Sequence, residues 1–232
     1  SFLQKGDEVI FNSNFVKDTY LHNFPNKNFH VIQRGIDTDY FRSSNYNSYD
    51  SIKRILLPSR ISNWKGHNIL LKYFKKNYLN LKIGNYKLVF ISSHESKDER
   101  KVDENIQKLN LSKFVLFEKP TLDIRKLYEK SYIVVNFSTR PEGFGRTVSE
   151  ALSMSKPVIA PNIGGTKEQL LKFDKKLLFN VNSYNSFIKS FKYVIKNYKI
   201  ITKKSRSFVI ENFSSKQMCK KTFDIYVNNI NK

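Results

Sequence analysis

The sequence predicts an α/β protein: a Rossmann-like parallel sheet with helices on both faces, followed by C-terminal helices. Two observations carry this prediction. Short runs rich in Val, Ile and Phe show little alternation of polar and apolar residues, which is typical of strands buried on both faces. These runs alternate with amphipathic stretches, and a βαβα order indicates parallel strands joined by helical crossovers.

Each apolar run is short enough for a strand, and most amphipathic stretches are long enough for a helix. Strands are predicted at residues 7–13, 30–34, 54–59, 87–92, 114–118, 132–138, 157–161 and 176–180. The helices between them are predicted at residues 14–24, 66–79, 97–109, 121–130, 145–154, 166–173 and 184–199. Two further helical segments, 202–212 and 214–230, end the chain, and the polar stretch 42–50 is predicted to be a linker or loop.

Length and composition exclude several classes of protein. The chain has 232 residues, of which 40% are hydrophobic and 26% charged, so it can bury a core and is not intrinsically disordered. No apolar run approaches the roughly 20 residues that span a bilayer, and the first residues lack a signal-peptide pattern. The single cysteine, Cys219, excludes a disulfide framework and an all-cysteine metal site. We therefore expect a soluble, cytoplasmic protein.

The formal net charge of +21 arises from 41 Lys and Arg against 20 Asp and Glu. Most of the basic residues are lysine, and Asn, Ile, Phe and Tyr are also abundant, which indicates a compositional bias acting on an ordinary fold. The charge leaves three interpretations open: a solvated basic surface without a dedicated partner, attraction to an anionic membrane, or binding of an anionic substrate. The sequence contains no recognisable nucleic-acid-binding motif.

The loop after the sixth predicted strand, STRPEGFGRTVSEAL (138–152), has the residues of a nucleotide-sugar site. It lies beyond the carboxyl end of a strand, where open α/β sheets bind their ligands. Gly143 and Gly145 allow close backbone approach before a helix whose free N–H groups favour a phosphate. Glu142 and Glu150 can only accept hydrogen bonds, which suits sugar hydroxyls. Alternatively, both carboxylates are ordinary acids at a helix start and on a solvated helix.

The loop after the third predicted strand, PSRISNWKGHNILL (58–71), contributes cations to the same sheet edge. Arg60 offers a planar fork and Lys65 a point charge, and together they could neutralise a diphosphate leaving group. Alternatively, two bases in a chain this basic have no special role. We expect Trp64 to pack the loop rather than stack on a ligand, and His67 to be a surface or helix-start histidine rather than a ligand.

A third loop, PNIGGTKEQLLKF (161–173), follows the seventh predicted strand. Gly164 and Gly165 precede a helix for which Thr166 is the predicted N-cap and Glu168 a helix-start acid. This second helix N-terminus either faces the sugar or only turns the chain.

Taken in order along the chain, these segments resemble the retaining glycosyltransferases of family 4, which have the GT-B fold. HVIQRGIDTDYF (30–41) is similar to the family's "vipnGvDtdrF" segment, and LPSRISNWKGHNILLKYF (57–74) to "vGRl…KGhdlLleaf". PEGFGRTVSEALSMSKPVIAPNIGGTKEQL (141–170) resembles the family's Glu-x7-Glu segment with its following Gly-Gly turn. The resemblance covers roughly residues 29–175, and the rest of the chain matches in pattern only.

The resemblance implies a role for each matching residue. Arg60 and Lys65 would hold the donor diphosphate, and the backbone from Phe144 to Thr147 would meet the phosphates and sugar. Glu142 would contact hydroxyls of the transferred sugar and Glu150 those of the ribose. The catalytic residues would be Glu142, Arg60 and Lys65. The implied donor-binding residues are Ser59, Arg60, Lys65, Glu118, Glu142, Gly143, Phe144, Gly145, Arg146, Thr147 and Glu150.

Three departures from the family pattern concern the same site. Ser59 stands where the family has the Gly before its Arg, and Ser155 replaces a Gly in the "GkPV" turn. The nucleobase would lie near Phe117, Glu118 and Lys119. Because Glu118 occupies a family Gly position, the selectivity for the base stays open.

The resemblance also implies a division of the chain. Residues 1–28 would be the remnant of an acceptor-side half, 29–212 the nucleotide-sugar-binding domain, and 213–232 a crossover helix. A complete enzyme of this type needs about two domains, so the chain would be the donor half. The crossover helix would pack across the missing half, leaving its apolar positions partly exposed, or it would instead pack against a partner chain. These positions are Phe213, Met218, Phe223, Ile225 and Tyr226.

The reaction implied is transfer of a hexosyl group from a UDP- or GDP-sugar to a hydroxyl acceptor with retention, in polysaccharide, lipopolysaccharide or glycolipid synthesis. No Asp-x-Asp pair lies near these loops, so we expect a metal-independent reaction without a cofactor. We predict donor binding, little activity from this chain alone, a peripheral location at an anionic membrane, and no nucleic-acid partner. Two alternatives remain: a non-catalytic nucleotide-sugar-binding module, and a basic polyanion-binding protein whose binding weakens steeply with salt.

Overall fold

The computed structural model describes residues 6, 8–25, 27–43, 51–77 and 84–230. Its centre is a six-stranded parallel sheet with the strand order β5-β4-β3-β6-β7-β8. The strands are β3 (Lys53–Arg60), β4 (Tyr86–Ile91), β5 (Val115–Glu118), β6 (Ile133–Val135), β7 (Val158–Pro161) and β8 (Leu178–Phe179). This arrangement confirms the predicted α/β class with a parallel sheet.

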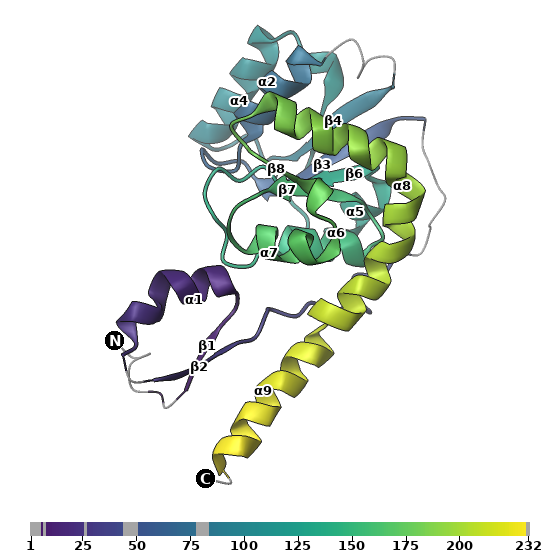
Figure 1. The fold of residues 1–232 in the computed structure, drawn as a ribbon. Helices are drawn as coiled ribbons and strands as arrows, with labels where there is room; N and C mark the ends of the chain where they lie inside the picture. The colour runs from purple at the N-terminus through teal and green to yellow at the C-terminus, as the bar shows by residue number, and fades with distance from the viewer. Residues whose placement is uncertain (1–5, 7, 26, 44–50, 78–83, 231–232) are drawn as a thin grey trace.

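Helices cover both faces of the sheet, with α2 and α4 on one side and α6 and α7 on the other (Figure 1). The helices are α2 (His67–Lys76), α4 (Lys97–Lys108), α5 (Arg125–Lys130), α6 (Arg146–Ser153), α7 (Gly164–Phe173), α8 (Tyr184–Phe213) and α9 (Ser215–Ile230). The central strand β6 has no exposed side chain, as its uninterrupted Val and Ile run predicts. The core therefore lies between the two helical layers.

The strand order reverses between β3 and β6, and this reversal positions the site. From β3 the chain moves outward through β4 to β5, and from β6 it moves outward the opposite way through β7 to β8. The loops after β3 and β6 therefore leave the sheet side by side and diverge. A crevice opens at such a switch point, at the carboxyl ends of the strands, and it is the usual ligand site of this architecture.

The N-terminal part forms a separate small sheet beside this domain (Figure 1). Strand β1 (Glu8–Phe11) pairs in parallel with β2 (Asn28–Val31), and α1 (Asn14–Tyr20) lies between them in the chain. The predicted helix 14–24 is thus shorter and ends in a 3₁₀ turn, Leu21–Asn23. The helix α1 contacts α7 of the larger domain.

The C-terminal segment bends close to the position where the sequence predicts a break between two helices. The sequence predicts helices at 184–199 and 202–212, and α8 consists of two helical segments that meet at a kink at Asn197, where the backbone is non-helical (φ −109°, ψ 17°). Tyr198 and Ile201 are buried, so the apolar face continues past the kink and holds both halves on the same core. Asn197 donates its side-chain amide to the Tyr193 carbonyl at 2.9 Å, which satisfies a helix acceptor at the bend.

Other boundaries shift by a few residues. The predicted helix 121–130 begins only at Arg125, whose backbone N–H donates to the Asp123 carboxylate at 3.3 Å in the preceding turn. The strand predicted at 132–138 ends at Val135, since Asn136 begins a network of polar contacts. Part of the predicted linker 42–50 and the end of the predicted helix 66–79 lie outside the described residues.

The last helix, α9, extends away from the six-stranded sheet and ends near the small N-terminal sheet in Figure 1. Phe223 and Tyr226 are 66% and 64% exposed, as expected for a helix with an uncovered apolar side. Phe213 was expected among these residues but is the last residue of α8 and is buried. None of the helices in the described part of the chain combines the length and apolar character that a membrane span requires.

Candidate functional site

Glu142 is the centre of a polar network at the switch point. The Ser138 hydroxyl donates to its Oε1 at 2.6 Å, and the Asn136 amide donates to its Oε2 at 3.2 Å. The Lys65 ammonium forms an ion pair with Oε1 from the neighbouring loop. Asn136 is itself fixed, because its Oδ1 accepts the Ser138 backbone N–H at 3.0 Å. The network therefore holds both oxygens of the carboxylate in fixed orientations.

The loop after β3 is shaped so that Lys65 reaches this carboxylate. Gly66 has φ +75°, and a Cβ there would lie 2.1 Å from the Phe137 carbonyl oxygen, so only glycine fits. The Trp64 carbonyl accepts the Thr139 N–H at 2.7 Å, which ties the two loops together. The Lys65 ammonium lies 4.0 Å from the centre of the Trp64 ring. The Trp64 ring therefore contacts the lysine within its own loop.

Arg60 occupies a different position from Lys65. It ends β3 with an exposed side chain and, among the described residues, does not join the Glu142 network. The neighbouring hydroxyl oxygens of Ser59 and Ser62 are buried without a hydrogen-bond partner in the described part of the chain. An unpartnered hydroxyl costs free energy unless a ligand or water satisfies it. Ser59, which stands where the family pattern has a glycine, thus adds a polar group to this edge of the sheet.

The start of α6 offers free N–H groups to an anion. Gly145 precedes the helix with φ +82°, and a Cβ there would lie 2.3 Å from Thr166 Cγ2. No side chain caps the helix, so the N–H groups of Arg146 and Thr147 have no intrahelical partner. The Gln169 amide donates to the Phe144 carbonyl at 2.5 Å and fixes the loop before the helix. This geometry suits a phosphate, as the sequence predicts.

The Gly164–Gly165 turn packs against the loop that contains Glu142 and Gly143. A Cβ on Gly165 would lie 2.4 Å from the Gly143 carbonyl oxygen, and the Gly165 N–H donates to the Glu142 carbonyl at 2.8 Å.

Two predictions about the start of α7, on Thr166 and Glu168, are wrong. Thr166 is not the N-cap, because α7 begins at Gly164, and the Thr166 hydroxyl donates to carbonyls of the preceding turn.

Glu168 is likewise not an acid of the first helical turn. Its Oε2 accepts the Asn14 backbone N–H at 3.0 Å, and its Oε1 accepts the Phe15 N–H at 2.6 Å. These are donors at the start of α1. Glu168 thus binds α1, and its two oxygens are occupied there rather than aimed at a sugar.

Glu150 lies one turn into α6 and is 9% exposed. Its Oε1 pairs with Arg146 at 2.9 Å, and its Oε2 accepts the Tyr128 hydroxyl at 2.9 Å. Burial, followed by the Glu150 charge, raises the pKa of Tyr128, so this hydroxyl stays protonated and donates. Glu150 is therefore held beside a cavity rather than solvated on the helix.

That cavity is an open cleft of about 560 Å³. The residues that line it include Glu150, Arg146 and the segment Arg34–Asp37, which lies between β2 and β3 in the chain. Leu122 and Ile124 form another side. The predicted nucleobase residues after β5 are not among the residues that line it.

The carboxyl end of β5 is nevertheless well defined. The Phe117 ring packs edge-on against Phe90 and His94, at 6.3 and 4.5 Å between ring centres. The Glu118 carbonyl accepts the Ser92 N–H at 3.0 Å, and Lys119 is exposed. The structure thus places these residues at the carboxyl end of the parallel sheet but does not bring Glu118 into contact with the Glu142 network in the described residues.

His67 is the first residue of α2, as predicted, but it is buried rather than on the surface. Its ring packs edge-on against Phe90 at 4.9 Å. Burial lowers the pKa of His67 to about 3, and the nearby Lys65 charge acts in the same direction. The imidazole is therefore neutral and part of the core beneath the loop.

Sequence reasoning missed four residues that hold the predicted ones in place: Asn136, Ser138, Tyr128 and Gln169. Asn136 and Ser138 could have been identified from the sequence, since they are polar residues that end an otherwise apolar strand at the ligand edge of the sheet. Tyr128 and Gln169 gave none, because each acts on a residue more than 20 positions away. Within the described residues, no group of three or more His, Cys, Asp or Glu side chains could hold a metal ion.

Known protein families and solved structures include relatives of this chain. The model of the family "Glycosyl transferases group 1" matches residues 42–213. An uncharacterized glycosyltransferase of Methanocaldococcus jannaschii is 28% identical over 182 residues, which is 77% of this chain and 47% of that protein. A glycosyltransferase structure from Rickettsia africae has a TM-score of 0.84 at 30% identity and covers 97% of this chain and 64% of its own.

A further structure, Anabaena HepE in complex with UDP and glucose, has a TM-score of 0.82 at 20% identity, covering 96% of this chain and 63% of its own. The present chain thus spans about half of its curated relative and under two thirds of these structures. The sheet, its covering helices and the C-terminal helices match the GT-B glycosyltransferases, which confirms the predicted fold class. Because the family model matches most of its length, the chain belongs to the glycosyl transferases group 1 family.

Proposed function

We propose that this chain is the donor-binding half of a retaining family 4 glycosyltransferase. It would bind a UDP- or GDP-hexose whose sugar is transferred to a hydroxyl acceptor in polysaccharide, lipopolysaccharide or glycolipid synthesis. The observation that carries this proposal is the switch-point crevice, where the ion-paired Glu142 and Lys65 lie beside the uncapped start of α6. The solved complexes of HepE with UDP and UDP-glucose support a uridine nucleotide as the first ligand to test.

Each part of the donor has a group of matching chemistry. The free N–H groups of Arg146 and Thr147 suit the diphosphate, and Glu150 beside the 560 Å³ cleft suits ribose hydroxyls. Glu142 suits the hydroxyls of the sugar. Lys65 would exchange its pairing with Glu142 for one with the diphosphate, and exposed Arg60 would add a second cation.

The proposed reaction breaks the bond between the anomeric carbon and the diphosphate oxygen and forms one to the acceptor oxygen on the same face. Charge builds on the leaving diphosphate, and fixed N–H donors with Lys65 and Arg60 stabilise it. The diphosphate takes the acceptor proton, so no metal ion or cofactor is needed in this scheme. The acceptor would be bound by a further domain, so we expect little or no transfer by this chain alone.

Calorimetric titration of UDP, GDP and their sugars into the chain tests donor binding. We expect UDP to bind with a dissociation constant below about 1 mM, which corresponds to roughly −4 kcal/mol. Glu150→Gln and Lys65→Met should each weaken binding about tenfold, since each removes a charged contact. Glu104→Gln, an exposed change on α4, is the matched control. Absence of binding by every nucleotide at millimolar concentration would overturn the proposal.

A further inference from the structure

The helix α8 concentrates basic charge on one face. It contains a single acidic residue, Glu211, near its end. Its exposed lysines are Lys189, Lys192, Lys196, Lys199, Lys203 and Lys204. Among the other helices, α4 balances four bases with four acids, whereas α2 also carries three lysines and no acid, so α8 is distinguished by the exposed apolar side chains between its lysines. We call the six lysines, together with the exposed isoleucines described next, the α8 basic face.

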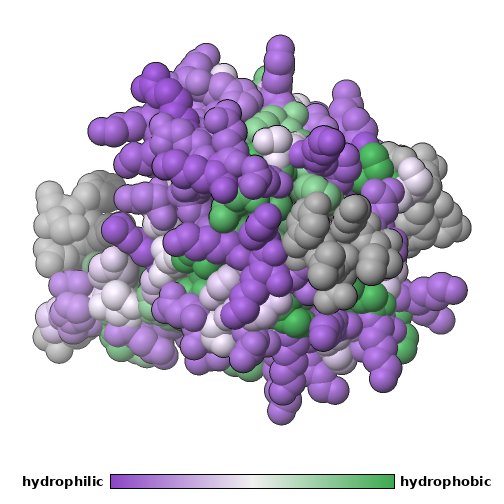
Figure 2. Space-filling model, turned by 90° about the horizontal axis from the view of Figure 1, so that it is seen from above, coloured by the Kyte–Doolittle hydropathy of each residue, from purple (hydrophilic) through white to green (hydrophobic). Residues whose placement is uncertain are grey.

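The α8 basic face also carries apolar side chains. Ile195, Ile200 and Ile210 are 38%, 57% and 42% exposed between the lysines. The opposite side of the helix is buried in the core through residues such as Phe191 and Val194. Viewed from above in Figure 2, the molecule shows hydrophilic side chains over most of its surface, with small hydrophobic patches between them. Lysines interspersed with isoleucines are the composition of a surface that meets anionic lipid headgroups.

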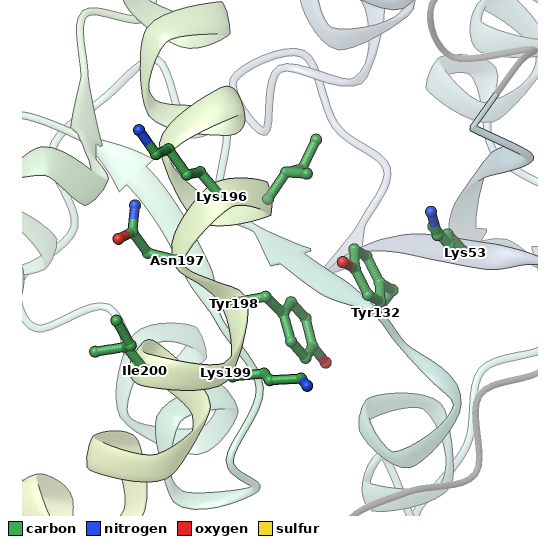
Figure 3. A pocket seen from close by; sticks show the side chains of 8 residues that line it. Lys53, Tyr132, Lys196, Asn197, Tyr198, Lys199 and Ile200 are labelled. Atoms are coloured by element: carbon green, nitrogen blue, oxygen red, sulfur yellow. The ribbon is translucent and has the colours of Figure 1, made fainter.

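A hollow of about 720 Å³ lies at the kink of α8. It is lined by Lys53, Tyr132, Ile195, Lys196, Asn197, Tyr198, Lys199 and Ile200, and none of these is acidic. Figure 3 shows the rings of Tyr132 and Tyr198 facing each other, with Lys53 beyond Tyr132 and Lys199 below Tyr198. The two rings are stacked with their centres 4.4 Å apart. The hollow thus combines three cations, two aromatic rings and two isoleucines.

This hollow is remote from the donor crevice. It lies against Lys53 at the start of β3 and Tyr132 just before β6, whereas the donor crevice lies at the opposite, carboxyl ends of the same strands. The first half of α8 also lies on the side of the domain away from α1, β1 and β2 (Figure 1). The cations of the hollow are therefore not part of the diphosphate site.

We propose that the α8 basic face docks on an anionic membrane surface, with headgroup phosphates entering the hollow at the kink. The charges are complementary to the phosphates, and the exposed isoleucines can enter the headgroup region. This inference does not depend on the proposed donor binding, because the two sites share no residue.

Cosedimentation with phosphatidylcholine vesicles, with and without phosphatidylglycerol, tests the inference. We expect the chain to bind only the anionic vesicles. The triple variant Lys196→Glu, Lys199→Glu, Lys203→Glu should bind them at least about tenfold more weakly, since each lysine near an anionic surface contributes to binding. The matched control changes three exposed lysines of α9: Lys216→Glu, Lys220→Glu and Lys221→Glu.

The two triple variants have the same net charge, so a difference between them isolates the face from the total charge. Ile200→Ser should lower anionic vesicle binding several-fold without changing any charge. Circular dichroism and UDP titration of each variant check the fold independently of vesicles. Equal losses in both triple variants, equal binding to neutral vesicles, or binding of single-stranded RNA in preference to anionic vesicles would overturn the proposal.

Discussion

At the residue scale, the ion pair between Glu142 and Lys65 shows how the site is prepared for an anion. Both side chains are mostly buried, and Glu142 also accepts hydrogen bonds from Ser138 and Asn136. A cation and an anion that satisfy each other keep a desolvated site neutral until a ligand arrives. A diphosphate that binds Lys65 leaves Glu142 with its two neutral donors, so the carboxylate stays oriented for sugar hydroxyls.

Ser138 is the residue that tests this interpretation. Ser138→Ala removes one donor from Glu142 but none from the diphosphate contacts, so we expect about tenfold weaker binding of UDP-glucose with little change for UDP. The measurement is the ratio of the two dissociation constants by calorimetry. Ser138→Thr keeps the hydroxyl and should restore the ratio. An equal loss of affinity for both ligands would show that Ser138 only supports the fold.

Some residues of the site can be predicted because they lie in local sequence motifs, whereas others depend on how distant elements pack. Glu142, Lys65 and Gly145 lie in local motifs whose spacing already indicates a phosphate-binding loop, and the structure brings them to one edge. Tyr128 holds Glu150 from another helix, 22 positions away in sequence. Such a partner depends on how two helices pack, and nothing in the local sequence specifies it. The same holds for Glu168, whose partner is α1 rather than its own helix.

At the element scale, Glu168 joins the small N-terminal unit to the donor loop. It accepts two backbone N–H groups and the Asn14 side-chain amide at 3.2 Å. The Ser13 hydroxyl accepts the Val16 N–H at 3.1 Å, so α1 has a cap of its own as well. A carboxylate at the positive end of a helix is favoured by the helix dipole. The contact therefore positions α1 beside Gly143, where an added Cβ would lie 3.3 Å from Val16 Cγ2.

Glu168→Ala should loosen α1 without unfolding the larger domain. We expect the amide hydrogens of Asn14 and Phe15 to exchange about tenfold faster, a change of about 1.4 kcal/mol, which lies within the range of roughly 0.5–2 kcal/mol for a lost helix cap. Hydrogen exchange read by NMR or mass spectrometry provides the measurement, with Glu211→Gln on α8 as the control. Unchanged exchange at both amides would contradict a holding role for Glu168.

The elements themselves were easier to predict than their ends. Uninterrupted apolar runs predicted all six strands of the main sheet, because strands buried on both faces tolerate few polar residues. The break within α8 was predicted a few residues too late, because the kink lies at Asn197 whereas the predicted helices end at 199 and begin at 202. Tyr198 and Ile201 are buried beyond the kink, so tertiary packing, which the local pattern does not contain, holds both segments on the same core.

At the scale of the whole molecule, two buried groups link folding to pH. Burial lowers the pKa of His67 from 6.5 to about 3, so the unfolded chain binds this proton first as the pH falls. For Glu99, partial burial raises the pKa, but hydrogen bonds from the Ser96 N–H and the Ser92 hydroxyl outweigh it and lower the pKa from 4.5 to about 2. Both contributions to stability are present at neutral pH and are lost on acidification.

The pH ranges over which His67 and Glu99 lose their contributions to stability differ, so the two contributions can be measured separately. His67 loses its contribution between pH 6.5 and about 3, whereas Glu99 loses its own only below pH 4.5. Between about pH 6 and pH 5 we expect the free energy of unfolding to fall by up to about 1.4 kcal/mol per pH unit from His67. Urea denaturation across this range measures the slope. His67→Phe should reduce it, while His22→Phe, an exposed change, should not; equal slopes in all three proteins would contradict the assignment.

The small sheet of β1 and β2 has a consequence for how this chain behaves outside a larger protein. Among the described residues, each of these two strands pairs only with the other, along one edge. Ile10 and Phe29 are 43% and 44% exposed on the same strands. An unpaired strand edge is a template for strand addition. A peptide or a second polypeptide that supplies the adjoining strand would therefore extend this sheet by β-augmentation, and in its absence the same edge is where intermolecular strand pairing would begin.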